Sequence, residues 1–241
     1  MDIKDWFTDW FNTSYYHILY KDRNDLDAQL FMKNITDFLE LPKSAHILYL
    51  PCGKGRHAVF LNSLGYKVTG ADLAKNSIVH AKQFENDNLK FKTHDMRNPL
   101  DKTYNAIFNL FTSFGYFVDD SEDIKILENI KKGLKKGGFF VFDFLNAEKV
   151  KANLVAKEIK IVDEITFNIE RKIINGFIIK NISFVADGKN HSFTEQVKYL
   201  DVDKVKTYLE QVGFTICNIF GNYTLTTFDR KKSDRLIIIA K

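Results

Sequence analysis

An apolar run that enters a glycine-rich turn and leaves it as a helix is the feature that most limits what this chain can fold into. The run Ile47–Leu50 leads into the turn Pro51–Gly55, and a helical pattern follows. A second apolar run, residues 66–71, ends in Asp72, nineteen positions after Gly53. Glycine lets a backbone approach a ligand closely, and an acid at a strand end can bind a ribose diol. The order strand, turn, helix, strand and acid therefore indicates a site for a nucleoside-containing cofactor.

The glycines alone do not distinguish between two such cofactors. Gly53, Gly55 and Ala58 also satisfy the dinucleotide fingerprint, in which a helix N-terminus faces a pyrophosphate. A dehydrogenase would need a general acid, however, and the sequence contains no Tyr-x-x-x-Lys motif. An NAD-binding oxidoreductase is therefore the less favoured interpretation.

Composition limits which classes of protein this chain can belong to. A chain of 241 residues, 45% hydrophobic and 27% charged, suits one globular unit with a sizeable core. The net charge of +4 is mild, so it does not argue for a nucleic-acid partner, although it does not exclude an RNA substrate. Cys52 and Cys217 form neither a metal-ligand spacing nor a disulfide framework, so no metal site is expected. Neither a membrane-spanning run nor a signal-peptide pattern occurs, so we expect a cytoplasmic protein without membrane contact.

Residues 1–22 are unusually aromatic. The i,i+4 pairs in this stretch predict a packed helix over Trp6–Phe11, followed by a functional turn at Ser14–Tyr20 that acts as a lid. A purely structural helix is the alternative, and membrane contact is less favoured because the segment is short and acidic. An amphipathic helix should follow, capped by Asn24 and ended by Pro42.

Downstream of Asp72, apolar runs of strand length alternate with amphipathic helical stretches. Helices are predicted over residues 76–85 and up to the glycines at 137–138, and strands over 89–93, 106–110 and 139–144. This alternation predicts an α/β fold with a parallel sheet covered on both faces. In such sheets, ligands bind at the carboxyl ends of the strands. Those ends carry Pro51–Gly55, Asp72, Asp95, Asn109–Tyr116 and Asp143.

Five motifs in order carry a resemblance to a known family. They are Pro-Cys-Gly-Lys-Gly-Arg-His at 51–57, the turn at Asp72, His-Asp-Met-Arg at 94–97, Asn-Leu-Phe-Thr-Ser-Phe-Gly-Tyr-Phe at 109–117, and Gly-Gly at 137–138. With this spacing, residues 45–145 resemble the class I S-adenosylmethionine (SAM)-dependent methyltransferases, especially the small-molecule branch that includes sugar-amine N-methyltransferases. The resemblance implies a Rossmann-like, seven-stranded methyltransferase sheet and SAM as cofactor.

The resemblance also implies how SAM would be held. The glycine turn would hold its methionine end, Asp72 its ribose hydroxyls and Asp95 its adenine amino group, while the loop from Asn109 would lie beside the sulfonium. Aromatic rings in that loop suit a soft cation. The cofactor-binding candidates are Pro51, Cys52, Gly53, Gly55, Arg56, Asp72, Leu73, Asp95, Met96, Asn109, Leu110, Phe111 and Phe114.

One position departs from the family pattern. The family usually carries an acid two residues before the position of Pro51, and here that residue is Tyr49. A phenol can still form hydrogen bonds, so we expect SAM binding that is weakened or re-routed. A non-catalytic SAM-binding regulatory protein is therefore an alternative.

From Val150 onward the pattern changes to alternating apolar and polar residues. Runs at 158–163, 165–174, 177–186 and 191–199, with Asn-Gly and Asp-Gly between the last three, predict a small antiparallel sheet inserted after the fifth strand. A structural cap or dimer contact is one interpretation, and a cover over the substrate is the favoured one. A helix over 201–212 and strands over 214–220 and 235–240 should follow. The expected division is 1–42 for the N-terminal helices and lid, 43–150 for the SAM-binding core, 151–200 for the β insertion and 201–241 for the completion of the core.

Methyl transfer requires little acid–base chemistry from a protein. It is an in-line displacement at carbon, so positioning and exclusion of water supply most of the acceleration. A nitrogen acceptor must also lose a proton, and the catalytic candidates are His17, Tyr16 and Tyr116, with His57 and His191 as further histidines.

The type of acceptor is constrained by one missing motif. No Asn/Asp-Pro-Pro-Tyr motif follows the fourth strand, which argues against amino-methylation of a nucleic-acid base. The sequence therefore predicts transfer of a methyl group from SAM to nitrogen or oxygen of a small molecule, by a monomer or homodimer. An RNA or protein methyltransferase is the enzymatic alternative.

Overall fold

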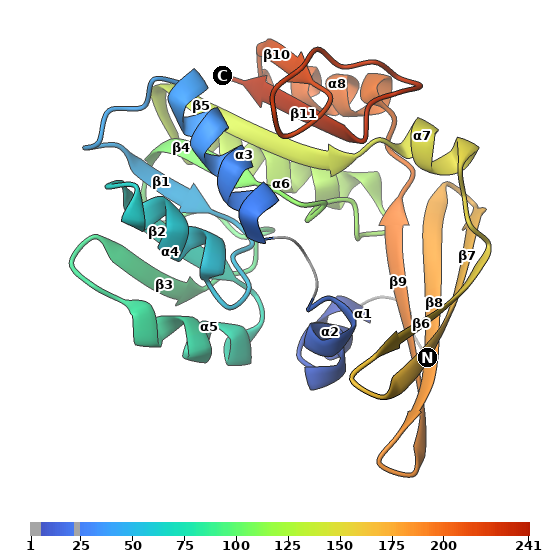
Figure 1. Cartoon of the computed structure of the whole chain (residues 1–241). Coiled ribbons are helices and arrows are strands. Elements are labelled where there is room, and N and C mark those ends of the chain that lie inside the picture. The colour runs from blue at the N-terminus through green and yellow to red at the C-terminus, as the bar shows by residue number, and fades with distance from the viewer. Residues whose placement is uncertain (1–5, 22–24) are drawn as a thin grey trace.

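The computed structural model describes residues 6–21 and 25–241 (Figure 1). Within these ranges, seven strands form one sheet in the order β10-β11-β5-β4-β1-β2-β3. Strands β1 to β5 are parallel, and β11 pairs antiparallel with both β5 and β10. The bounds are β1 His46–Tyr49, β2 Lys67–Asp72, β3 Leu89–Thr93, β4 Tyr104–Asn109, β5 Leu134–Leu145, β10 Ile216–Phe220 and β11 Arg235–Ala240. The predicted seven-stranded, Rossmann-like sheet is confirmed.

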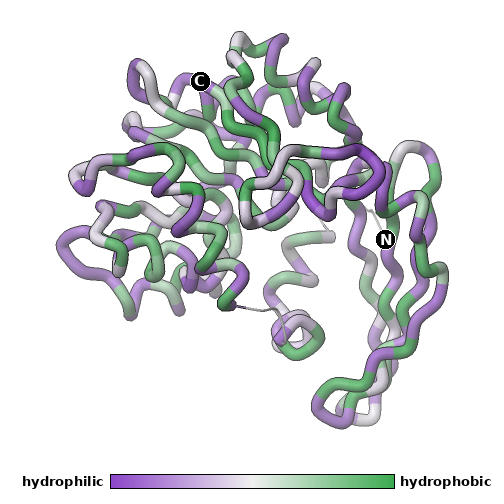
Figure 2. The backbone as a smooth tube through the Cα atoms, turned by 45° about the horizontal axis from the view of Figure 1, so that its top comes forward, coloured by the Kyte–Doolittle hydropathy of each residue, from purple (hydrophilic) through white to green (hydrophobic). Residues whose placement is uncertain are grey.

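Helices cover both faces of this sheet, which explains why its central strands β1 and β4 are mostly buried along their length. On β1, Ile47 and Tyr49 pack with the helices of one face, and Leu48 packs with those of the other. A strand buried on both sides lacks the alternation of a half-exposed strand. In Figure 2 the central strands are accordingly mostly green. The first face carries α3 (Asp25–Phe38), α4 (Arg56–Ser63) and α5 (Lys75–Ala81), and the second carries α6 (Asp120–Lys132) and α8 (Val202–Gln211).

A separate antiparallel sheet follows β5 and the short helix α7 (Ala147–Ala152), as predicted. Its order is β6-β7-β8-β9, with bounds β6 Lys157–Val162, β7 Ile165–Ile174, β8 Phe177–Ala186 and β9 Lys189–Lys198. The Asn-Gly and Asp-Gly pairs form its last two turns, where Asn175, Gly176, Asp187 and Gly188 all have positive φ. Two successive positive φ values match the twist of a tight hairpin, which is why these dipeptides identify the turns from sequence.

The first two helices pack on this second sheet rather than on the main core. α1 (Trp6–Trp10) and α2 (Ser14–Leu19) contribute Trp10 and Leu19 to an apolar cluster with Phe167 and Ile182 of β7 and β8. Figure 1 shows both helices between the large sheet and the small one. We call α1, α2 and β6–β9 together the cap. No helix of the described part of the chain is long and apolar enough to cross a membrane.

Two local predictions were wrong. Residues 14–19 form the helix α2 instead of a turn, because the Thr13 hydroxyl accepts a hydrogen bond from Tyr16 N–H (3.1 Å) and caps the helix. The helix expected to reach the glycines at 137–138 ends at Lys132. There the carbonyl of Gly133 accepts a bond from Tyr104 N–H (2.8 Å), which directs the chain into β5.

Other boundaries moved by a few residues. α1 ends at Trp10, α5 gives way to a 3₁₀ turn at Lys82–Phe84, and the strand expected from Phe214 begins at Ile216. The cap expected at Asn24 lies outside the described residues.

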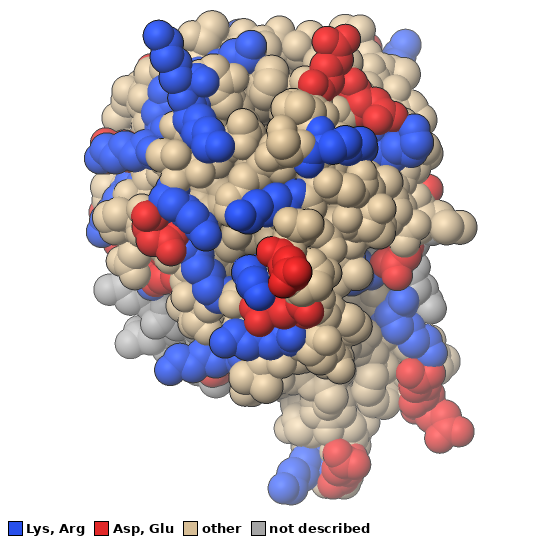
Figure 3. All heavy atoms as spheres, turned by 90° about the vertical axis from the view of Figure 1, so that its left-hand side faces the viewer, with Lys and Arg blue, Asp and Glu red and all other residues tan. Residues whose placement is uncertain are grey.

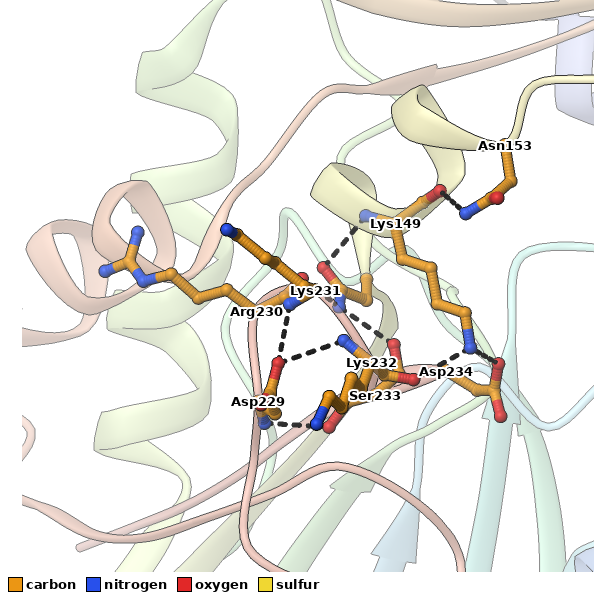
Figure 4. Close-up of polar contacts among 9 residues, drawn as sticks. Lys149, Asn153, Asp229, Arg230, Lys231, Lys232, Ser233 and Asp234 are labelled. Carbon is orange, nitrogen blue, oxygen red and sulfur yellow. Dashed lines mark hydrogen bonds and ion pairs between the residues drawn. The ribbon is translucent and has the colours of Figure 1, made fainter.

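Two sets of contacts fix the cap to the core. Just before the chain enters the small sheet, Asn146 donates from Nδ2 to the carbonyls of Arg230 and Ser233 (both 2.8 Å). Lys149, on α7, donates to Asp234 (2.6 Å) in the same loop between β10 and β11 (Figure 4). The loop therefore anchors the chain just before it enters the small sheet.

At the other end of the cap, the buried Lys198 connects β9 with the core. Its backbone N–H donates to the carbonyl of Gly115 (2.7 Å), and its ammonium group contacts Asp120 (2.7 Å) and the fully buried Asp123 (2.6 Å). Both carboxylates belong to α6. Two ionic hydrogen bonds offset the cost of burying a lysine and define where the cap stands.

Candidate active site

A cavity of about 780 Å³ lies between the carboxyl ends of β1, β2 and β4 and the inner face of the cap. That volume is typical of sites for cofactors and small ligands. The core contributes the glycine turn, the end of β2 and the loop after β4, and the cap contributes α1, α2 and side chains of β7 to β9. The cavity therefore has a core wall and a cap wall made by distant parts of the chain.

The glycine turn and Asp72 form one unit in the core wall. Gly53 N–H donates to Asp72 Oδ2 (2.7 Å), and Ala74 N–H donates to Oδ1 (2.8 Å). Burial raises the pKa of Asp72, and the hydrogen bonds from Ala74 and Gly53 oppose that rise. The carboxylate is thus held in a fixed position with lone pairs left for a ligand.

Gly53 opens the turn toward the cavity. Its φ is +53°, and a Cβ built on it would meet nothing within 4 Å. Gly55 is different, because at φ +89° its Cα lies against the ring of Phe91, and a Cβ would come within 2.7 Å of that ring. Gly53 therefore leaves space for a ligand, whereas Gly55 lets the turn pack against β3.

The loop after β4 supplies the middle of the core wall. Leu110, Phe111, Thr112 and Ser113 line the cavity, and two of them, Phe111 and Thr112, have positive φ. Tyr116 donates from its hydroxyl to the carbonyl of Thr112 (2.7 Å). The loop thus presents a phenyl ring and backbone polar groups to the cavity in a constrained conformation.

Tyr49, which stands in place of an acid, is almost fully buried at 2% exposure and lines the cavity. A hydrogen bond of 2.8 Å joins its hydroxyl to His57 Nδ1, and the His57 ring lies 4.6 Å from the ring of Phe111. Burial raises the pKa of Tyr49 well above its usual value, so the phenol stays neutral. Tyr49 therefore links β1 to α4 and, through His57, to the loop after β4.

The cap wall contains a hydrogen-bonded carboxylate. Glu195 Oε1 accepts from Trp10 Nε1 (2.8 Å) and from the Tyr20 hydroxyl (2.6 Å). Lys180 donates to that Tyr20 oxygen and lies 3.7 Å from Glu195 Oε2. Tyr20, Lys180 and Glu195 all line the cavity, so an ionic group faces the glycine turn from the cap.

The structure brings some of the predicted cofactor-binding residues to the cavity. Those that line it are Pro51, Cys52, Gly53, Arg56, Asp72, Leu110 and Phe111. Of these, Arg56 forms an ion pair with Asp25 of α3.

The other predicted cofactor-binding residues do not line the cavity; they are Gly55, Leu73, Asp95, Met96, Asn109 and Phe114. Asn109 is buried and donates from Nδ2 to the carbonyl of Leu50 (2.9 Å), which ties β4 to the end of β1. Asp95 contacts Arg97 Nη2 at 2.6 Å, and although its partial burial acts the other way, this ion pair keeps the pKa of Asp95 below its usual value.

All three predicted catalytic residues, His17, Tyr16 and Tyr116, line the cavity. Burial lowers the pKa of His17 to about 4, with the positive charges of Lys54 and Arg56 acting in the same direction. The imidazole is therefore neutral at physiological pH. The Tyr116 hydroxyl is engaged with a backbone carbonyl. Of the further histidines, His57 lines the cavity and His191 instead stacks on Phe184 within the cap.

Among the cavity residues that were not identified from the sequence are Lys180, Glu195 and Tyr223. Arg235, a charged residue at the start of the predicted last strand, also lines the cavity. The alternation of β9 carried a signal, since Glu195 shares a strand face with Phe193 and Val197. Within the described ranges, no group of three or more His, Cys, Asp or Glu side chains is arranged to hold a metal ion.

Comparison with known proteins shows the family to which this chain belongs. The family model described as "Tellurite resistance protein TehB" matches residues 4–170 of this chain. A Haemophilus influenzae protein named "Probable S-adenosyl-L-methionine-dependent methyltransferase TehB" is 29% identical over 109 residues, which are 44% of this chain and 38% of that protein. The matched region thus spans well under half of that relative.

Two solved structures share the fold across nearly the whole chain. A SAM-dependent methyltransferase from Clostridium acetobutylicum superposes with a TM-score of 0.80 at 19% identity, covering 94% of this chain and 95% of that one. SAM-bound CalS10, an amino pentose methyltransferase from Micromonospora echinaspora, superposes with a TM-score of 0.73 at 15% identity, covering 95% of this chain and 96% of that one. At these identities the likeness concerns the fold.

Proposed function

Because this chain belongs to the TehB family of SAM-dependent methyltransferases, we propose that it transfers a methyl group from SAM to a nitrogen or oxygen atom of a small molecule held between the core and the cap. The observation that carries this proposal is the cavity itself. One wall is a glycine turn bonded to the half-buried Asp72, and the other is a cap with its own polar groups.

The residues of the core wall fit SAM. The open space over Gly53 admits a ligand to the turn, and the Asp72 carboxylate can accept hydrogen bonds from a ribose diol. When bound, SAM supplies a methyl group activated by a positively charged sulfur. The ring of Phe111 and the constrained backbone of its loop suit a soft cation, because aromatic faces and carbonyl oxygens attract positive charge.

The chain's own contribution to the reaction is positioning and exclusion of water. α1, α2 and the small sheet close the cavity over the core wall, which orders an acceptor and limits solvent around the transferred group. His17 is neutral at physiological pH and lies in the cavity wall, so its imidazole can accept a proton from an amine acceptor. A pKa of about 4 makes it a weak base, which suits a proton lost from an already methylated ammonium better than one removed from a hydroxyl.

A small acceptor is favoured by the shape of the site. The cap leaves a walled cavity, and CalS10, whose acceptor is an amino pentose, shares the fold over nearly the whole chain. A long RNA or protein acceptor would be expected to use a continuous charged surface. On the face shown in Figure 3, acidic side chains lie among the lysine and arginine side chains. The alternative with a macromolecular acceptor is therefore less favoured.

The proposal is tested by measuring S-adenosylhomocysteine formed from SAM in the presence of separate panels of amines, hydroxyl compounds, oxyanions that include tellurite, RNAs and proteins. The expected result is product formation with a small amine or hydroxyl compound. Glu195→Gln should reduce turnover, since it removes the charge of the cap carboxylate while keeping its shape. Turnover only with an RNA or a protein would contradict the small-molecule proposal. SAM binding without turnover on any panel would favour the regulatory alternative.

A further inference from the structure

The loop after β4 holds a conformation that its residues do not prefer. Phe111 has φ +59° and Thr112 has φ +63°, and both residues carry a Cβ. The left-handed conformation costs an L residue free energy, and a β-branched residue such as threonine is especially unfavourable there. Two such residues in succession persist only where the surroundings hold them. Both line the cavity, so whatever holds them also shapes the site.

Asp143 at the end of β5 holds the backbone of this loop. Its Oδ2 accepts a hydrogen bond from Phe111 N–H (2.7 Å), and its backbone carbonyl accepts from Thr112 N–H (3.0 Å). The N–H groups of the two left-handed residues are thus bonded to one residue of the neighbouring strand. The Asp143 side chain is fully buried, at 0% exposure.

Arg235, the first residue of β11, completes the arrangement. Its Nε donates to Asp143 Oδ1 (2.7 Å), and its Nη2 donates to the Thr112 hydroxyl (3.0 Å). That hydroxyl also accepts from Leu145 N–H (3.1 Å). Burial raises the pKa of Asp143, and the positive charge of Arg235 opposes the rise. One guanidinium group therefore stabilises the carboxylate and holds the threonine side chain, which a single ammonium cannot do with the same planar geometry.

We infer that Arg235 is a positioning residue of the methyl-donor site: by bridging Asp143 and Thr112 it fixes the loop after β4 in the left-handed conformation that lines the cavity. Arg235 itself lies in the cavity wall and its guanidinium is 5.7 Å from the ring centre of Tyr223, which packs against Phe111. The C-terminal strand thereby controls a segment more than a hundred residues earlier in the chain. This inference rests on the proposed function, since it assigns the loop to binding of SAM.

The test is calorimetric titration of SAM into the full chain and its variants, with thermal unfolding measured in parallel. Arg235→Met should weaken SAM binding at least ten-fold. Arg235→Lys, which keeps the charge but not the fork, should recover only part of that loss. Arg230→Met is the matched control, because Arg230 lies in the preceding loop, forms an exposed ion pair with Asp203 and does not line the cavity. It should bind SAM as the unchanged protein does.

A double variant separates positioning from simple charge neutralisation. Arg235→Met leaves the buried Asp143 carboxylate without its cation, so thermal stability should fall as well. Adding Asp143→Asn removes that charge and should restore much of the stability, while SAM affinity should stay low because the bridge to Thr112 is still missing. Recovery of affinity together with stability would overturn the inference, as would unchanged SAM binding by Arg235→Met. If the unchanged protein does not bind SAM, the proposed function fails instead.

Discussion

Gly53 and Gly55 lie two residues apart in the same turn, yet substituting alanine for each should have different consequences. Both have positive φ, at +53° and +89°. A Cβ at position 53 would meet nothing within 4 Å, whereas one at position 55 would lie 2.7 Å from two ring atoms of Phe91 and 3.0 Å from the Cβ of Ala81. The pair therefore separates the backbone cost of the turn from the cost of a steric clash.

The magnitudes follow from these contacts. A left-handed conformation costs an L residue about 1–2 kcal/mol, and the reduced freedom of the unfolded chain offsets about 0.4–1 kcal/mol of this. Gly53→Ala should therefore lower the free energy of unfolding by about 1 kcal/mol. Gly55→Ala has the same backbone cost plus about 1–3 kcal/mol for overpacking, which gives about 2–4 kcal/mol in total. For a chain of this size the melting temperature changes by about 2–4 °C per kcal/mol.

Urea unfolding followed by circular dichroism measures both variants. Phe91→Leu tests the assignment of the clash, because leucine lacks the ring atoms that an alanine at position 55 would meet. Phe91→Leu should lower the free energy of unfolding by about 1–2 kcal/mol less in the Gly55→Ala variant than in the unchanged protein, as expected for residues in contact. Equal destabilisation by Gly53→Ala and Gly55→Ala, or strict additivity with Phe91→Leu, would refute this reasoning.

Three further predictions concern buried polar groups. Burial raises the pKa of Asp123 to about 6, so the stability that this group contributes is complete below about pH 4 and is lost as the pH rises through 6. Urea unfolding should therefore show a free energy of unfolding that falls between pH 4 and pH 6. Asp123→Asn should abolish this contribution to the pH dependence. NMR should show the His17 ring titrating near pH 4, and Lys54→Met should raise that midpoint because it removes a nearby positive charge. A midpoint above pH 6 in the unchanged protein would contradict the conclusion that burial lowers the pKa of His17. Tyr49→Phe should lower the free energy of unfolding by about 1–3 kcal/mol, because it removes the 2.8 Å hydrogen bond between the buried Tyr49 hydroxyl and the half-buried His57. An unchanged urea midpoint would contradict this.

The core could be predicted from sequence because its signals are local. Strand β1 reads as an unbroken apolar run since both of its faces are buried, and the glycines after it mark a turn that other residues enter only with strain. The last two hairpins of the small sheet were marked by Asn-Gly and Asp-Gly, because each of these tight turns is formed by two adjacent residues. Such features need no knowledge of distant partners.

The cap wall could not be predicted, because its contacts join distant parts of the chain. Trp10 and Tyr20 donate to Glu195 from 185 and 175 residues away, so no local pattern shows that the aromatic N-terminus packs on the small sheet. The role of Arg235 depends in the same way on Asp143, 92 residues earlier. The contact of Asp95 with Arg97 is the exception, since a pair two residues apart could have been anticipated from the sequence.

The most direct test of the central claim is calorimetric titration of the protein with SAM and, separately, with NAD, using Asp72→Ala as the comparison. Asp72 Oδ2 accepts the N–H of Gly53, so removing the carboxylate withdraws both a ligand contact and the support of the turn. We predict saturable SAM binding that Asp72→Ala abolishes, and no binding of NAD. Binding of NAD without SAM would contradict the account.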